Sequence, residues 1–163
     1  TEPEYSSMIP DTMRVFLRSS VFPYNIVEES KAILNTAGQA SFVFNNALNA
    51  VNYYIQLKYR NGLETWSNAA QSFNSNQMSF DFTYDNSMSY GSNMVLKGIK
   101  WTIYSGDVNQ DGIIDATDLS ETENAVSVNL SGYVVEDITG DLYCDASDLS
   151  IVENNLGVSA VTP

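Results

Sequence analysis

The sequence has no histidine, and that absence excludes most familiar catalytic and metal centres. A Ser-His-Asp triad, a Cys-His dyad and an imidazole-ligated zinc or iron site all require the missing side chain. Cysteine is almost absent as well. Cys144 stands alone, so it cannot form an internal disulfide, and without a histidine base it is best interpreted as a small core residue. We therefore predict that the chain is not an enzyme.

Long apolar runs and basic residues are also scarce. No run approaches the roughly 18 apolar residues that cross a bilayer, so no membrane span is expected. Seven Lys and Arg residues stand against 20 Asp and Glu residues, for a net charge of −13. This balance argues against a nucleic-acid partner. Residues 101–163 contain no Lys or Arg at all, and their carboxylates would repel one another unless divalent cations belong to the fold.

Residues 12–104 show an apolar and polar period of two, which places alternate side chains on opposite faces of a strand. The alternation is clearest over 78–84 and 53–60, and Asn61-Gly62 predicts a tight hairpin turn that returns along 63–67. Further strands are expected at 12–18, 26–34, 39–45 and 95–103. The pattern predicts a mostly β protein with a small α part, in which residues 12–104 form an immunoglobulin-like antiparallel β-sandwich.

Residues 1–11 fit this pattern poorly. The segment is largely polar, and Pro3 and Pro10 cannot donate a hydrogen bond to a strand ladder. We interpret it as an N-terminal arm that is either a loose tail or an edge strand whose partner lies elsewhere. If residues 1–11 do not form a strand, the predicted sandwich lacks one strand.

The composition changes after Ser105, and one unit of sequence then occurs twice, beginning at Asp107 and again at Asp137. Each copy places side-chain oxygens at positions 1, 3, 5, 9 and 12 of a twelve-residue loop and a main-chain carbonyl at position 7, which is the spacing that supplies calcium with about six to eight oxygen ligands. The predicted ligands are Asp107, Asn109, Asp111, the Ile113 carbonyl, Asp115 and Asp118 in the first loop, and Asp137, Thr139, Asp141, the Tyr143 carbonyl, Asp145 and Asp148 in the second.

We expect two calcium ions, with the second site the weaker. Thr139 offers a neutral oxygen, and Leu142 stands where the first loop has Gly112. A left-handed backbone at a leucine costs about 1–2 kcal/mol of conformational energy, if the loop requires it at that position. The apolar residues at position 8, Ile114 and Cys144, are expected to pair with each other across the two loops.

This pair of loops resembles a type I dockerin over residues 105–157, because a predicted helix follows each loop, at 116–129 and 149–156, and Asp closes each at position 12. The resemblance implies two calcium-loop and helix units packed antiparallel. In dockerins that bind cohesins, small hydroxylated residues at loop positions 10 and 11, together with basic residues along the helix, contact the partner. Ala116-Thr117 and Ala146-Ser147 match the first half of that pattern, and the two predicted helices carry no Lys or Arg.

Segments upstream, such as Lys58-Tyr59-Arg60-Asn61 and Glu64-Thr65-Trp66-Ser67, resemble uncharacterised secreted bacterial proteins in which an immunoglobulin-like sandwich precedes a dockerin-like pair. The resemblance implies an extracellular or cell-surface location. We accordingly predict an N-terminal arm at 1–11, a sandwich at 12–104 and a dockerin-like calcium-binding domain at 105–163.

Two structural functions follow from these features. In the first, the arm within Thr1–Ser20 donates a strand to the open sheet of a neighbour, giving a homo-oligomer that grows by strand exchange into a pilus-like fibre. In the alternative, the dockerin-like half anchors the protein to a cohesin-like receptor. Within the donor arm, Val15 and Leu17 alternate with Arg14 and Arg18, as expected of a donated strand.

Two other possibilities are weaker. An aromatic set could stack on sugars, although such residues more often form core or cross-strand pairs; it comprises Tyr53, Tyr54, Tyr59, Trp66, Trp101 and Tyr104. Carboxylate pairs such as Glu28 with Glu29, or Glu64 with Asp81, could suggest a glycosidase, but nothing in their spacing supports one.

Overall fold

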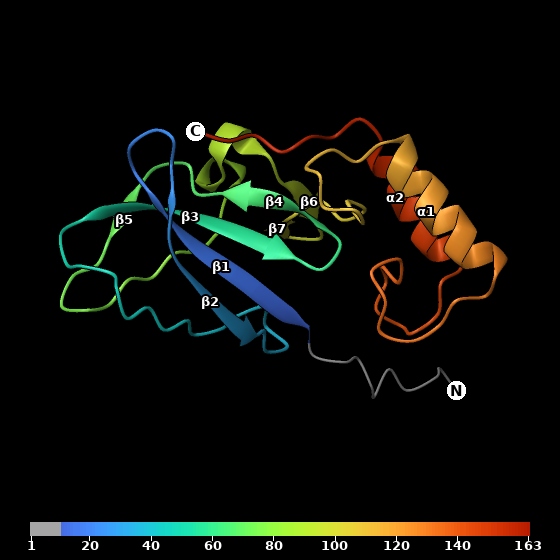
Figure 1. The fold of residues 1–163 in the computed structure, drawn as a ribbon, viewed down its shortest axis with the longest axis horizontal. Coiled ribbons are helices and arrows are strands. Elements are labelled where there is room, and N and C mark those ends of the chain that lie inside the picture. Colours follow the sequence, from blue (N-terminus) through green and yellow to red (C-terminus); the bar gives the residue numbers. More distant parts are fainter. Residues whose placement is uncertain (1–10) are drawn as a thin grey trace.

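The computed structural model describes residues 11–163, with β-strands gathered at one end and two helices at the other (Figure 1). The strands are β1 (Thr12–Ser19), β2 (Ile26–Ile33), β3 (Asn52–Tyr59), β4 (Gly62–Trp66), β5 (Gln71–Ser72), β6 (Val95–Lys97) and β7 (Lys100–Thr102). Two short 3₁₀ helices, η1 (Asn86–Met88) and η2 (Tyr90–Ser92), precede β6, and the α-helices are α1 (Ala116–Ser127) and α2 (Ala146–Asn155). In this described part of the chain, neither α-helix has the length and apolar character needed to cross a membrane.

The main sheet is antiparallel, in the order β2-β1-β3-β4, with β5 also paired to β3. β1 therefore has a partner on each side: Val15 lies opposite Ser30 of β2 and opposite Leu57 of β3. The strand-donation hypothesis placed the donor within Thr1–Ser20. Residues 1–10 lie outside the described part, and residues 12–19 are already engaged as an inner strand of their own sheet.

One face of this sheet carries the core that the alternation predicted. Met13 and Val15 of β1 and Ile55 of β3 are buried there against Phe82 and Met94. Burying apolar surface at about 25 cal/mol per Å² is the main favourable term for such a packing. The layer that covers this face is mostly irregular chain, together with the two-stranded ribbon β6-β7.

Several predicted strands are absent from this covering layer. Residues 78–84 are not a strand, because the Asp81 carboxylate accepts hydrogen bonds from the Thr83 amide and hydroxyl and turns the chain. Residues 39–45 run beside β2 but meet it through side chains: the Asn45 amide donates to Glu28 Oε1 at 2.8 Å. The expected strand at 95–103 is instead the β6-β7 hairpin. The described residues thus hold a five-stranded and a two-stranded sheet, and the immunoglobulin-like arrangement is not confirmed.

The hairpin between β3 and β4 exists, but its turn lies one residue earlier than predicted. Tyr59 pairs with Gly62, which leaves Arg60 and Asn61 as the two turn residues. Gly62 lies close to Ile103, since a Cβ there would lie 2.7 Å from the Cδ1 atom of that side chain. The β3-β4 hairpin therefore packs against residue 103.

The aromatic residues on the other face of the sheet pack against one another. Trp66 is 5% exposed, and the rings of Tyr24 and Tyr54 meet it edge-on, with centroids 6.4 Å away in both cases. The Arg18 guanidinium lies over the Trp66 ring at 5.1 Å. Tyr53 is likewise buried, on the core face. These two members of the suggested sugar-stacking set therefore serve packing.

α1 begins at Ala116 as predicted, whereas α2 begins at Ala146, three residues before the predicted start at 149, and an aspartate predicted only as a calcium ligand caps each helix. Asp115 caps α1 by accepting from the Thr117 amide, and Asp145 caps α2 by accepting from the Ser147 amide, both at 2.7 Å. An aspartate side chain at this position satisfies main-chain donors that a helix start leaves free. The helices contact each other directly and lie side by side in Figure 1.

The chain after α2 returns across the molecule to the sheet end, where the C-terminus lies (Figure 1). The Ala160 amide donates to the Gly112 carbonyl at 2.8 Å, and Val161 packs so closely on Gly91 that a Cβ there would meet its Cγ1 atom at 2.6 Å. This C-terminal segment thus touches both the first loop and η2.

Candidate metal centre

The position-12 aspartates close both loops from within. Asp118 is fully buried and accepts from the Val108 amide at 2.9 Å and the Asp115 amide at 2.9 Å. Asp148, also fully buried, repeats the arrangement with the amides of Ile138 and Asp145. The internal symmetry of the sequence is therefore reproduced in the hydrogen bonds of the two loops.

The position-1 aspartates differ. Both are 1% exposed, but Asp137 accepts from the Gly140 amide at 2.8 Å with Oδ1 and from the Leu142 amide at 3.1 Å with Oδ2. In Asp107, Oδ2 accepts from the Gly112 amide at 3.3 Å, whereas the buried Oδ1 has no hydrogen-bond partner. A buried acceptor without a partner costs about 1–3 kcal/mol.

The first loop fits a calcium ion. Burial, and then the neighbouring carboxylate of Asp118, raises the pKa of Asp107 to about 6. The neighbouring negative charge that disfavours a bare Asp107 carboxylate would favour a cation bound there, and that cation would give the buried oxygen a partner. With the partnerless Asp107 oxygen and an otherwise hard-oxygen donor set, the loop suits calcium. Asp107, Asn109, Asp111, Asp115 and Asp118 would hold it with the Ile113 carbonyl.

The remaining predicted ligands are engaged in local turns. Asn109 accepts from the Asp111 amide at 2.8 Å, Asp111 from the Ile113 amide at 3.0 Å, and Asp141 from the Tyr143 amide at 2.9 Å. Among residues 11–163, the structure brings no three Asp, Glu or Cys side chains together as a metal-holding cluster. The two complete ligand sets, which include Asp137, Thr139, Asp141, the Tyr143 carbonyl, Asp145 and Asp148, therefore stay predictions.

Position 6 is left-handed in both loops. Gly112 has φ +91°, and Leu142 has φ +74°. The sharp turn that the spacing required is thus made twice, once by a residue without a Cβ and once by a leucine.

The expected pairing of the position-8 residues is wrong, although both are buried. The Ile114 amide donates to the Val158 carbonyl, after α2, and the Cys144 amide donates to the Leu130 carbonyl, after α1. Each loop therefore pairs with the chain that follows the helix of the other repeat. The packing of two antiparallel helices brings the end of each helix beside the start of the other, so the loops meet these segments.

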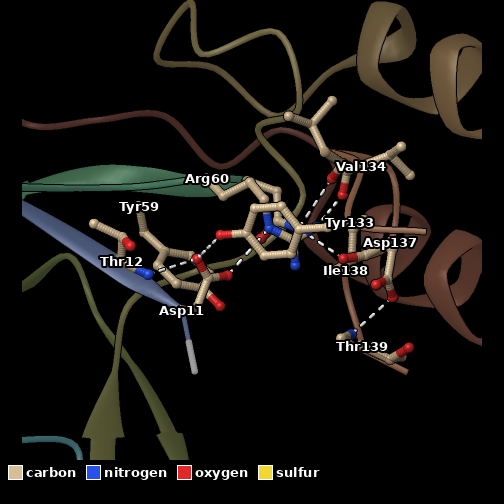
Figure 2. Close-up of polar contacts among 12 residues, drawn as sticks. Asp11, Thr12, Tyr59, Arg60, Tyr133, Val134, Asp137, Ile138 and Thr139 are labelled. Atoms are coloured by element: carbon tan, nitrogen blue, oxygen red, sulfur yellow. Dashed lines mark hydrogen bonds and ion pairs between the residues drawn. The ribbon is translucent and has the colours of Figure 1, made fainter. Parts of the chain in front are cut away.

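A polar junction joins the sheet to the second loop (Figure 2). Arg60 donates to Asp11 Oδ2 at 3.1 Å and to the Val134 carbonyl, and its guanidinium lies 4.6 Å from the centre of the Tyr133 ring. Tyr133 donates its hydroxyl proton to Asp11. Burial by itself would raise the pKa of Asp11, but the hydrogen bonds from Tyr133 and Tyr59 outweigh it, and the pKa is lowered.

Asn61 extends this junction. Its side-chain amide donates to the carbonyls of Val135 at 2.9 Å and Asp137 at 3.1 Å, and it is fully buried. A pocket of about 100 Å³ between the sheet and the second loop is lined by Arg60, Tyr133 and Asp137, among others. Sequence reasoning treated Asn61 only as a turn residue, because nothing local in the sequence indicates a contact with residues so distant along the chain.

The residues at loop positions 10 and 11 are accessible. Ala116 and Thr117 at the start of α1, and Ala146 and Ser147 at the start of α2, are all exposed. Their main chains are fixed by the caps, so the side chains project from two rigid helix ends.

Residues 105–157 match the family model of the dockerin type I domain. Dockerin type I domains bind calcium, in agreement with the oxygen-rich loops described above. No curated protein matches the chain. Among solved structures, a chain of a type II Cohesin-X-Dockerin complex from Acetivibrio cellulolyticus, an N-terminal interface mutant, is similar with a TM-score of 0.55 and 17% identity, over 93% of this chain and 85% of that one. At this identity the likeness concerns the fold.

Proposed function

We propose that this protein is a non-enzymatic, extracellular or cell-surface anchoring protein whose dockerin part binds a cohesin-like receptor in the presence of calcium. The observation that carries the proposal is the dockerin match at residues 105–157 together with the exposed pairs at the starts of α1 and α2. The structurally similar complex contains a cohesin and an X-dockerin, which supports a partner of the same kind.

The proposed module boundaries are an arm at 1–11, a sandwich-like module at 12–104 and the dockerin part at 105–163. We assign the sandwich-like module a supporting role, because Tyr53 and Trp66 are buried in packing and several of its charged groups form ion pairs. Lys58 and Glu64, for example, form an ion pair at 2.9 Å. We also propose that residues 12–104 are related in architecture to an immunoglobulin-like sandwich. The apolar core between the main sheet and the chain that covers it supports this proposal.

Two calcium ions are proposed, one in each loop, with the second bound more weakly. Calcium would supply the positive charge that holds the oxygen ligands together, while the chain positions the ligands. The weaker second site follows from the neutral oxygen of Thr139 and from Asp137, whose two oxygens already accept main-chain hydrogen bonds.

The receptor surface is expected to be neutral or basic. Residues 101–163 contain no Lys or Arg, and the exposed faces of α1 and α2 present Glu121, Glu123 and Glu153. Opposite charge on the partner would speed association and make binding sensitive to salt. Strand donation, the other function considered, has no observation in its favour, since β1 is engaged within its own sheet.

Capture by purified cohesins tests the proposal. With calcium present, the full chain should bind at least one member of a panel of type I and type II cohesins, and excess EDTA should abolish the binding. Thr117→Asp with Ser147→Asp should weaken binding by at least about tenfold, which corresponds to about 1.4 kcal/mol.

The matched control is Thr36→Asp with Ser41→Asp, which adds the same charge at exposed positions of the sheet module. This variant should bind like the wild type. Failure of the whole panel to bind the folded, calcium-loaded protein would contradict the proposal, and so would equal losses in the two double variants.

A further inference from the structure

We propose that the β3-β4 turn, through Asn61, positions the two calcium loops relative to each other, so that calcium binding in the dockerin part depends on the sheet. The inference rests on the calcium binding proposed above. Asn61 belongs to the sheet module, yet its main-chain carbonyl accepts from the Gly106 amide at 2.7 Å and its side chain donates to the Asp137 carbonyl at 3.1 Å. Gly106 directly precedes Asp107, so this one residue contacts the starts of both loops.

The same turn also contacts the chain that leads into the second loop, at residues 134–137. Arg60 donates to the Val134 carbonyl, and Asn61 donates to the carbonyls of Val135 and Asp137. Figure 2 shows Arg60 and Tyr133 between Asp11 and this stretch of chain. A buried main-chain carbonyl needs a donor, and the turn supplies one to Asp137, the first predicted ligand of the second loop.

The first loop is held from the same turn by a different residue. Gln110, at position 4, has a left-handed backbone with φ +59°, and its side-chain amide donates to the main-chain carbonyls of Tyr59 and, at 3.0 Å, Arg60. Position 4 is not a predicted calcium ligand. Its side chain is used to tie the loop to the sheet.

An apolar contact lies beside these hydrogen bonds. Leu63, the second residue of β4, is 1% exposed and packs with Val108 of the first loop and Ile138 of the second, and with Ile114 and Val152. Both residues at position 2 of the loops thus share one buried side chain from the sheet. The turn and the start of β4 together form a spacer of fixed dimensions between the two calcium sites.

A fixed spacer has a thermodynamic consequence. If one rigid turn holds the first residue of each loop, Asp107 and Asp137, then ordering one loop also orders the other. The binding of calcium to one loop is then coupled to its binding to the other. Couplings of this type are usually worth a factor of about 5–150 in affinity. Loosening the turn should therefore weaken calcium binding, even though the turn supplies no ligand.

Calorimetric titration of calcium into the calcium-free full chain tests the inference. Asn61→Ala removes the side-chain donor and should lower the affinity by about fivefold or more. Gln110→Asn shortens the other tether, keeps an amide that tolerates the left-handed backbone, and should give a smaller loss. The control is Ser67→Ala. Ser67 is fully buried, and its hydrogen bonds to Ile55 and Ala69 stay within the sheet module.

The control should lose thermal stability while keeping the wild-type calcium isotherm. Isotherms of Asn61→Ala and Gln110→Asn that both superimpose on that of the wild type would overturn the inference and leave the proposed function intact. If Asn61→Ala does not fold, Gln110→Asn alone decides. A wild-type chain that binds no calcium would instead overturn the proposed calcium role, and this inference with it.

Discussion

Leu142 shows how far a single residue can be forced from its preference by the loop around it. It holds a left-handed backbone with φ +74° at the position where the first repeat has Gly112. For an L-residue with a Cβ this conformation costs about 1–2 kcal/mol relative to the right-handed region. The strain is tolerated because the Leu142 amide must reach Asp137 Oδ2, at 3.1 Å.

We predict that Leu142→Gly is more stable than Leu142→Ala by about 1 kcal/mol, because both remove the side chain but only glycine adopts this backbone freely. Denaturant unfolding in EDTA measures the difference. The same pair of substitutions at Leu156, where φ is −54°, should give the opposite order. Equal stabilities at position 142 would show that the turn relaxes without glycine.

At the scale of elements, β4 links the main sheet to the apolar cluster of the dockerin part. Its pairing with β3 places it in the main sheet, but Leu63 is buried in the apolar cluster of the dockerin part, beside Ile114 and Val152. The two halves of the chain therefore share a structural element, and they are expected to unfold together.

Leu63→Ala should lower the free energy of unfolding by about 2–5 kcal/mol, the usual cost of this truncation in a core. It should also separate the unfolding of the helices, followed by far-ultraviolet circular dichroism, from that of the sheet module, followed by the fluorescence of Trp66 and Trp101. Ile55→Ala, in the sheet core, is the matched control and should lower stability without separating the two transitions. Coincident transitions in Leu63→Ala would contradict the shared role of β4.

At the scale of the whole molecule, the charge is unevenly placed. The net charge of −13 is concentrated after residue 100, where no basic side chain offsets it. Within this part, the described contacts to a positive group come from the sheet, through Arg60 beside Tyr133 and Val134. The carboxylates after residue 100 thus have no basic side chain of their own stretch of chain beside them, and Arg60 supplies a positive neighbour from the sheet module.

Chelation should therefore lower the melting temperature of the full chain. If free calcium exceeds its dissociation constant about a hundredfold, binding contributes about 2.7 kcal/mol, and a chain of this size loses on the order of 5–10 °C when that contribution is removed. Differential scanning calorimetry in EDTA, with calcium then restored in excess as the control, measures the shift. An unchanged melt in EDTA would contradict calcium binding by the folded state.

Features that depend on neighbours in the chain were predicted well. Helix α1, the sharp turn at position 6 and the strands near 12–18, 26–34 and 53–60 follow from local spacing, whereas the caps at Asp115 and Asp145 and the burial of the aspartates at position 12 were not predicted. The second layer of the sheet module was predicted poorly. Over 78–84 the apolar residues alternate as in a strand, yet Asp81 forms a local turn that competes with strand pairing.

The oxygen-rich loops and the helices that follow them could be inferred from the residues alone, because the predicted ligands of each loop lie in one short stretch of chain. The packing of the folded chain was needed to show that each loop pairs with the segment after the other helix, and that Asn61 lies between the two loop starts. These contacts join residues far apart in the chain, and they arise from how the helices and the sheet pack, which no local pattern of residues encodes.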